Sequence, residues 1–205
     1  MLLFLMTSFQ DSTPQHLFYK FFHDDEPSDS QEVEDSQQKA EAPPLDPVEY
    51  RKARKRKLQR VVERLHSMYL FYAATNAKTT EAEMQLLNSD AIVPEFETGH
   101  FRLIKGDPFP QDMRVIWISV NGVGVAFVCY DYDNRVQGEI TLRVLVRKLH
   151  ECRFILQPSE IFNRPEKIDI LLNKFVPCGH TLFMNHRVIK QLEKECDVLF
   201  KAIGN

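Results

Sequence analysis

Three acidic and amide side chains in the middle of the chain have the spacing of a metal-binding loop. Asp131, Asp133 and Asn134 resemble the first ligands of a calcium loop. Arg135 and Val136 follow where the next ligand is needed, and the later glycine and glutamate are out of register. A polar turn after a strand explains the sequence DYDN better than a calcium site does.

The cysteines and histidines do not form a second candidate site. Cys178 and His180 are potential zinc ligands, but zinc usually takes four ligands at knuckle spacings. His150, Glu151 and Cys152 are consecutive on a predicted helix, where neighbouring side chains point apart, so a catalytic pair is not expected. The sequence has no C-x-x-C pair, and we interpret its thiols as reduced ones in a cytosolic protein: Cys129, Cys152, Cys178 and Cys196.

Phosphate-binding and nucleophile motifs are absent from the sequence. There is no G-x-S-x-G, no Walker loop and no G-x-G-x-x-G. The GVG at Gly122–Gly124 lies in a predicted hairpin rather than before a helix, so it does not form a phosphate cradle. We therefore predict no enzyme activity, no cofactor and no metal ion.

The strongest charge feature is a basic block. Asp24–Glu49 contains ten acidic residues and one lysine, whereas Arg51–Arg60 contains seven basic residues and no acidic one. The net charge of −3 disfavours a nucleic-acid-binding protein. Three interpretations stay open: a solvated or partner-facing helix end, a membrane-surface patch, and a nuclear address or nucleic-acid contact. The candidate contact residues are Arg51, Lys52, Arg54, Lys55, Arg56 and Lys57.

The elements that position this block begin with a pair of strands at Leu2–Phe9 and His16–Phe22. The segment 24–44 is acidic and poor in apolar residues, which predicts a disordered linker or an inserted loop. Asp46 and Pro47 then have the types of a helix cap and first helical residue. The helix that follows carries an apolar face at helical spacing: Leu58, Val61, Val62, Leu65, Met68, Tyr69 and Tyr72.

The second half of the chain predicts more strands and then helices. Thr75–His100 is polar and predicted to be a loop, and a strand begins at FRLIKG. Val115–Val120 and Val123–Tyr130 flank an Asn-Gly turn, which indicates a hairpin, and their apolar residues predict cover on both faces. Three helices are predicted: Thr141–Phe154, Pro165–Phe175 with Asn163 as its cap, and one from His186.

This order favours one α/β (α+β) domain over residues 1–205. Consecutive strands predict a five-stranded, mainly antiparallel sheet with helices on both faces and an extra C-terminal helix, which is a longin-like arrangement. The apolar start MLLFLMTSF is predicted to be a strand rather than a signal peptide, and no run is long enough for a membrane span.

The C-terminal half resembles the sigma (small) subunit family of the fifth adaptor protein complex. The resemblance spans about residues 98–196, and the helix Leu58–Tyr72 and the first strand match more loosely. It rests on FRL at Phe101–Leu103, Pro108–Phe109, Arg114 with Trp117, Gly124–Ala126, Asp131, Asn134, Glu139, TLR at Thr141–Arg143, LQPS at Leu156–Ser159, KFVPCGHTLFMN at Lys174–Asn185 and LEKE at Leu192–Glu195.

The resemblance implies a non-catalytic small subunit in a cytosolic heterotetramer with two large chains and a medium chain. It also implies work with the spatacsin–spastizin pair in cargo sorting or retrieval, peripherally on late endosome and lysosome membranes. Two alternatives remain. One is a longin-type module that binds a small GTPase or its exchange factor, since one fold serves several functions. The weaker one is a nucleic-acid-associated protein acting through residues 51–60.

Overall fold

The computed structural model describes residues 1–10, 13–23, 47–75, 97–182 and 185–203. The elements, in chain order, are β1 Leu3–Ser8, β2 Gln15–Phe21, α1 Pro47–Thr75, β3 Glu97–Leu103, β4 Met113–Val120, β5 Val123–Tyr130, α3 Arg135–Glu151, α4 Glu160–Asn163, α5 Pro165–Phe175, the short 3₁₀ helix η1 Pro177–Gly179 and α6 His186–Ile203.

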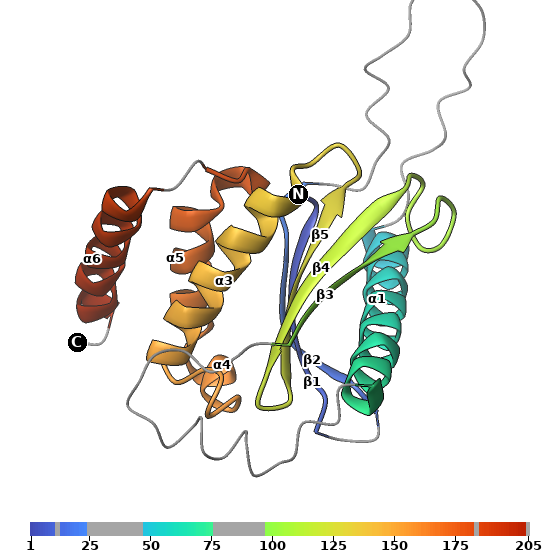
Figure 1. Cartoon of the computed structure of the whole chain (residues 1–205), viewed down its shortest axis with the longest axis horizontal. Helices are drawn as coiled ribbons and strands as arrows, with labels where there is room; N and C mark the ends of the chain where they lie inside the picture. Colours follow the sequence, from blue (N-terminus) through green and yellow to red (C-terminus); the bar gives the residue numbers. More distant parts are fainter. Residues whose placement is uncertain (11–12, 24–46, 76–96, 183–184, 204–205) are drawn as a thin grey trace, which may run out of the picture.

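The five strands form one sheet in the order β2-β1-β5-β4-β3, and every neighbouring pair is antiparallel. The tight turn between β4 and β5 has positive φ at Asn121 (52°) and Gly122 (71°), as an Asn-Gly hairpin turn requires. Figure 1 shows α1 on one side of the sheet, with α3 and α5 on the other and α6 outside them.

Alternation along the strands divides the core into two layers. One layer packs strand residues such as Leu3, Leu5 and Trp117 against the inner face of α1. That face supplies four side chains that are at most 1% exposed: Leu58, Val61, Val62 and Leu65. At about 1.5–3 kcal/mol each, their burial contributes on the order of 6–12 kcal/mol before conformational entropy is counted.

The opposite layer packs strand residues such as Phe4, Phe127 and Ile118 against α3 and α5. The two helices provide most of its remaining side chains, which are Leu142, Leu145, Val146, Leu149, Ile168, Leu171, Leu172 and Phe175. Both faces of the β4–β5 hairpin are therefore covered, as its apolar sequence predicts. The longin-like α/β fold, the antiparallel sheet and the extra C-terminal helix are confirmed.

Three local predictions are wrong. β3 begins at Glu97, inside a segment predicted to be a loop. α3 begins at Arg135 rather than Thr141, because the Asn134 side chain accepts a hydrogen bond from the Gln137 amide (3.1 Å) and caps the helix. Asn163 does not cap α5. It ends the separate helix α4, and its side chain donates to Glu160. The predicted linker 24–44 and the predicted cap Asp46 lie outside the described residues.

Candidate functional site

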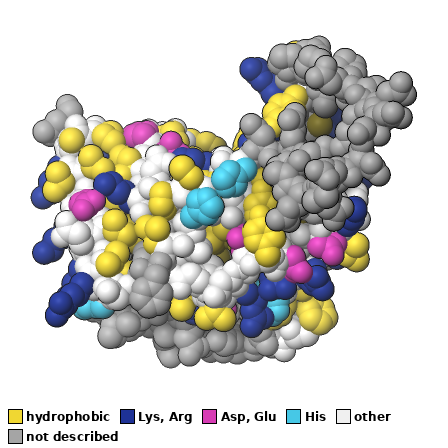
Figure 2. All heavy atoms as spheres, turned by 90° about the horizontal axis from the view of Figure 1, so that it is seen from above, with side chains coloured by type: hydrophobic (Ala, Val, Ile, Leu, Met, Phe, Trp, Pro, Cys, Tyr) yellow, Lys and Arg dark blue, Asp and Glu magenta, His cyan; other side chains and the backbone are white. Residues whose placement is uncertain are grey.

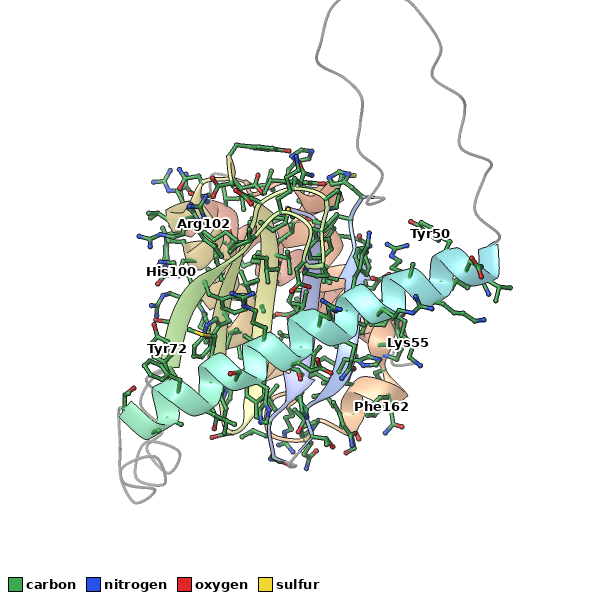
Figure 3. All side chains as sticks on the ribbon, turned by 90° about the vertical axis from the view of Figure 1, so that its right-hand side faces the viewer. Tyr50, Lys55, Tyr72, His100, Arg102 and Phe162 are labelled. Carbon is green, nitrogen blue, oxygen red and sulfur yellow. The ribbon has the colours of Figure 1, made fainter. Side chains whose placement is uncertain are left out.

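The basic block occupies the first turns of α1, and its side chains point in several directions. Arg51, Lys52, Lys55 and Arg56 are exposed, whereas Arg54 and Lys57 are half-buried. In Figure 3, α1 crosses the sheet obliquely and its first turns, marked by Tyr50, extend past the sheet border. The six candidate residues thus do not form one flat surface, because 3.6 residues per turn distribute them around the helix.

The half-buried basic residues lie against aromatic rings. The Arg54 guanidinium carbon lies 3.9 Å from the centroid of Phe21, on β2, and the Lys57 ammonium lies 5.9 Å from that of Phe109. Cation–π contacts of this kind stabilise the folded state by about 0.5–1 kcal/mol at exposed sites. Part of the basic block therefore attaches the start of α1 to the body of the protein.

A cavity of about 340 Å³ opens between β2 and these turns. We call it the β2–α1 cavity. Leu3 and Leu5 face α1, and the register pairs them with Phe21 and Tyr19, so both aromatic side chains share that face. The cavity is lined by Tyr19, Phe21, Arg51, Arg54, Lys55 and Leu58.

The sequence identified three of these lining residues and missed the other three. Arg51, Arg54 and Lys55 are candidates from the basic block and meet in the cavity, whereas Lys52, Arg56 and Lys57 do not line it. Tyr19, Phe21 and Leu58 were expected only as strand and core residues. The two-residue spacing of Tyr19 and Phe21 predicts that they share a face, but not that α1 crosses that face.

The residues of the rejected calcium loop have structural partners. Asp131 pairs with Arg102 (3.1 Å) and Arg114 (2.9 Å). Asp133 accepts a hydrogen bond from the Tyr130 amide (2.9 Å), and Asn134 caps α3. Across the described parts of the chain, no three His, Cys, Asp or Glu side chains gather closely enough to hold a metal ion.

Three of the four cysteines, Cys129, Cys152 and Cys196, lie in surroundings that disfavour the reactive thiolate. Burial raises the pKa of Cys129 to about 12 and that of Cys196 to about 11. Cys152 is the C-cap of α3, and burial raises its pKa as well. Glu151 beside it pairs with Lys148 (3.0 Å). Cys178 is exposed in η1, and the nearby His180 ring lies 5.9 Å from His23.

Gly122–Gly124 belongs to the hairpin, as predicted. Gly124 pairs with Thr7 across β1 and β5, and a Cβ atom there would lie 2.4 Å from the Phe9 ring. Close packing against an aromatic side chain, rather than phosphate binding, accounts for this glycine.

A second hollow lies between α5 and α6, where a cavity of about 330 Å³ is lined by Lys174, Gln191, Lys194, Glu195, Val198 and Leu199. We call it the α5–α6 cavity. Hydrophobic, basic and acidic side chains are interspersed over the helical side of the molecule in Figure 2. Val198 is 67% exposed and Ile203 44%. α6 therefore leaves apolar surface open to solvent.

None of the described helices is both long enough and apolar enough to cross a membrane.

Comparison with known proteins assigns the chain to a family. The model of the family "AP-5 complex subunit sigma-1" matches residues 1–197. A human protein named AP-5 complex subunit sigma-1 is 32% identical over 164 residues, covering 76% of this chain and 82% of the relative. The mouse protein of that name is 29% identical over 126 residues, covering 58% of this chain and 74% of the relative. With the longin-like fold and a match through all five strands, the chain belongs to the AP-5 sigma-1 family of adaptor complex small subunits.

Proposed function

We propose that this chain is the non-catalytic small subunit of a heterotetrameric adaptor complex that sorts or retrieves cargo at late endosomes and lysosomes. The family match over residues 1–197 is the observation that carries the proposal, because it spans the whole sheet and the helices on both faces. The relatives are named as subunits of the AP-5 complex. On this proposal the partners are two large chains, one medium chain and the spatacsin–spastizin pair.

Residues 1–205 form a single domain in this proposal, with 24–44 as an insertion between β2 and α1. The complex associates with the membrane peripherally from the cytosol, and the first turns of α1 provide contact residues: Arg51, Lys52, Arg54, Lys55, Arg56 and Lys57. Four of these residues, Arg51, Lys52, Lys55 and Arg56, are exposed, and the start of α1 extends past the sheet border in Figure 3. This supports a contact role, since an exposed helix end is accessible to a partner.

The raised thiol pKa values and the partners of Asp131 and Asp133 support a non-catalytic role. A catalytic site needs reactive groups that converge in a cleft. The described lining of the β2–α1 and α5–α6 cavities contains ammonium, guanidinium, carboxylate, amide, phenol and apolar groups, but no histidine or cysteine.

Affinity purification of the tagged full chain with quantitative mass spectrometry tests the assignment. We expect near-stoichiometric recovery of two large chains and one medium chain, and co-fractionation with late endosome and lysosome membranes from which high salt releases the complex. Recovery of a small GTPase or its exchange factor without the large chains would support the regulatory-module alternative instead. DNA binding with a steep salt dependence would support the nucleic-acid alternative.

A further inference from the structure

The β2–α1 cavity combines positive charge with an aromatic wall. Arg51, Arg54, Lys55 and Leu58 have the spacing i, i+3, i+4, i+7, so they lie on one face of α1. Tyr19 and Phe21, two residues apart on β2, supply the opposite wall. Their rings meet edge to face with centroids 6.1 Å apart. Three cationic side chains thus converge on one concave site whose walls come from separate elements.

Arg54 is the half-buried cation of the three, and Arg51 and Lys55 are exposed. The Arg54 guanidinium carbon is 3.9 Å from the Phe21 centroid, a distance at which the group contacts the ring. Arg51 is exposed and lines the same cavity, and the planar set of N–H donors on its guanidinium suits phosphate oxygens. Lys55 is exposed and contributes a flexible ammonium group to the same cavity.

The charge of the cavity favours a dianion. The exposed lining residues Arg51 and Lys55 carry two positive charges, and the described lining contains no carboxylate. A phosphate monoester carries about −1.5 to −2 charges at neutral pH, which matches this set better than one carboxylate does. The volume of about 340 Å³ is at the lower end of the range of roughly 300–1,000 Å³ for ligand sites, which favours a compact group.

We propose that the β2–α1 cavity binds a phosphorylated serine, threonine or tyrosine side chain in an extended segment of a partner protein. Among the described strands, β2 pairs with β1 alone, so its outer main-chain edge borders the sheet beside the cavity. Extended peptides bind at such edges through main-chain hydrogen bonds, and alternate side chains then reach pockets in the face of the sheet. The site does not depend on which complex the chain joins.

The geometry favours a phosphopeptide over a lipid surface. A flat membrane attracts basic side chains that face it together, whereas Lys52 and Arg56 lie on a different face of α1 from the cavity residues. This arrangement also supplies matched controls, because Lys52 and Arg56 are exposed basic residues in the same turns that do not line the cavity.

The test uses the purified full chain, with residues 24–46 present in every variant. Its binding is measured to immobilised peptide libraries that carry phosphoserine, phosphothreonine or phosphotyrosine at a fixed position. The comparison is with the same libraries after phosphatase treatment. We expect retention by the phosphorylated libraries only, with competition by inorganic phosphate. The double variant Arg51→Ala/Lys55→Ala should bind at least about tenfold more weakly, the factor that loss of charge-assisted hydrogen bonds predicts. Lys52→Ala/Arg56→Ala should stay within about twofold of the parent chain.

Thermal melting of both double variants verifies that the chain remains folded. Because Arg54 packs on Phe21, it is tested separately as Arg54→Lys, which keeps the charge and loses the planar donors. Equal loss in the two double variants would show diffuse charge attraction and overturn the proposal. Equal retention of the dephosphorylated libraries would overturn it too, as would the absence of any peptide retention. So would binding to phosphatidylserine-containing vesicles without phosphopeptide binding.

Discussion

α1 and α6 lie at opposite outer sides of the molecule and are held there by different forces. α1 packs directly on the sheet, and Leu58, Val61, Val62 and Leu65 on it are at most 1% exposed. On α6 only Cys196 is buried among the described residues. Both helices have amphipathic sequences, but α1 is deeply buried because it packs on the sheet, whereas α6 makes shallow contacts because it packs outside α3 and α5.

Polar contacts fasten α6 to the helices beneath it. Three ion pairs join it to α3 and α5: Arg147–Glu193 at 3.0 Å, Lys148–Asp197 at 2.9 Å and Lys174–Glu195 at 2.8 Å. Ile189, Leu192 and Phe200 are partly buried against the core, whereas Val198 and Ile203 stay exposed. Because partly exposed ion pairs contribute at most about 1 kcal/mol each, α6 should be the less stable of the two helices.

The largest predicted difference between the two helices concerns a core leucine and a surface leucine. Leu65→Ala removes a side chain with 0% exposure from the α1 layer and should lower the free energy of unfolding by about 2–5 kcal/mol. Leu199→Ala removes one that is 37% exposed on α6 and should lower it by no more than about 0.5 kcal/mol. Chemical denaturation of the purified variants measures both values.

The same substitution in two helices is a matched pair, because the change in intrinsic helix propensity is the same. Similar destabilisation by the two substitutions would contradict the comparison and place Leu199 in a cooperative core. A small effect of Leu65→Ala would mean that the α1 layer packs less tightly than its burial indicates.

The sequence predicted the α1 layer well and the edges of elements poorly. The apolar face Leu58–Tyr72 and the Asn-Gly hairpin are strong local signals, and both were confirmed. The start of α3 was missed because Gly138 interrupts the helical pattern, although this glycine lies close to the Ile116 side chain. β3 was placed too late because Glu97–His100 is polar, as suits an edge strand with a partner on one side only.

A second prediction compares glycines on the two sides of the sheet. Gly99 packs on the α1 side, where an added Cβ would lie 2.7 Å from the Trp117 ring. Trp117 is fully buried beneath Tyr72, so it has little room to move. Gly99→Ala should therefore destabilise the protein by about 1–3 kcal/mol, measured as a shift in the denaturation midpoint.

Gly138→Ala is the counterpart on the α3 side. Its Cβ would lie 2.9 Å from the terminal methyl group of Ile116, which can turn aside more readily than an indole ring. A glycine-to-alanine change within a helix also stabilises it by up to about 1 kcal/mol, so a net change near zero is expected. Equal destabilisation at both positions would show that the α3 layer is as rigid as the α1 layer.

The candidate site follows the same division between local and distant signals. The basic residues of the β2–α1 cavity stand together in sequence and could be named from it. Tyr19 and Phe21 are about thirty residues away, and their position beside Arg54 depends on the strand order and on the direction in which α1 crosses β2. Sequence alone does not fix these two properties, because they result from packing of the whole sheet.

A smaller effect is predicted for the ion pairs of α6. Lys148 is 7% exposed and pairs with both Glu151 and Asp197. Lys148→Met keeps the buried stem and removes both pairs, so amide hydrogens of α6 should exchange about 2–5-fold faster, matching roughly 0.5–1 kcal/mol of local stability. Arg143→Met is the control, because it removes the exposed Arg143–Glu139 pair within α3 and should leave α6 exchange unchanged.

The pH dependence of this attachment follows from the pKa of Lys148. Burial lowers that pKa, but hydrogen bonds and charges from Asp197 and Glu151 raise it by more, so the net direction is upward. A raised lysine pKa gives stability that is complete below the unfolded value of about 10.4 and is lost as pH rises through the folded value. The protection of α6 amide hydrogens, corrected for intrinsic exchange, should therefore be constant from pH 6 to pH 9. Constant here means a change in local stability of less than roughly 0.5 kcal/mol, which is the size of the contribution of one such ion pair. A loss of protection within this window would show that another group controls the attachment.

The smallest effect is predicted for the acidic segment that connects β2 to α1. If burial against the sheet holds α1 in place, the chemistry of its connection should matter little. Replacing Asp24–Pro44 with a Gly/Ser linker of equal length keeps the loop-closure entropy nearly constant and removes the carboxylates. The melting temperature should therefore change by less than about 2 °C, a shift equivalent to roughly 0.5–1 kcal/mol in a domain of this size. A decrease of more than about 5 °C would show that the segment packs on the domain, and that α1 depends on contacts beyond its buried face. An unchanged melting temperature, in contrast, together with the large effect of Leu65→Ala, would show that the inner face of α1 provides the stability on the α1 side of the sheet.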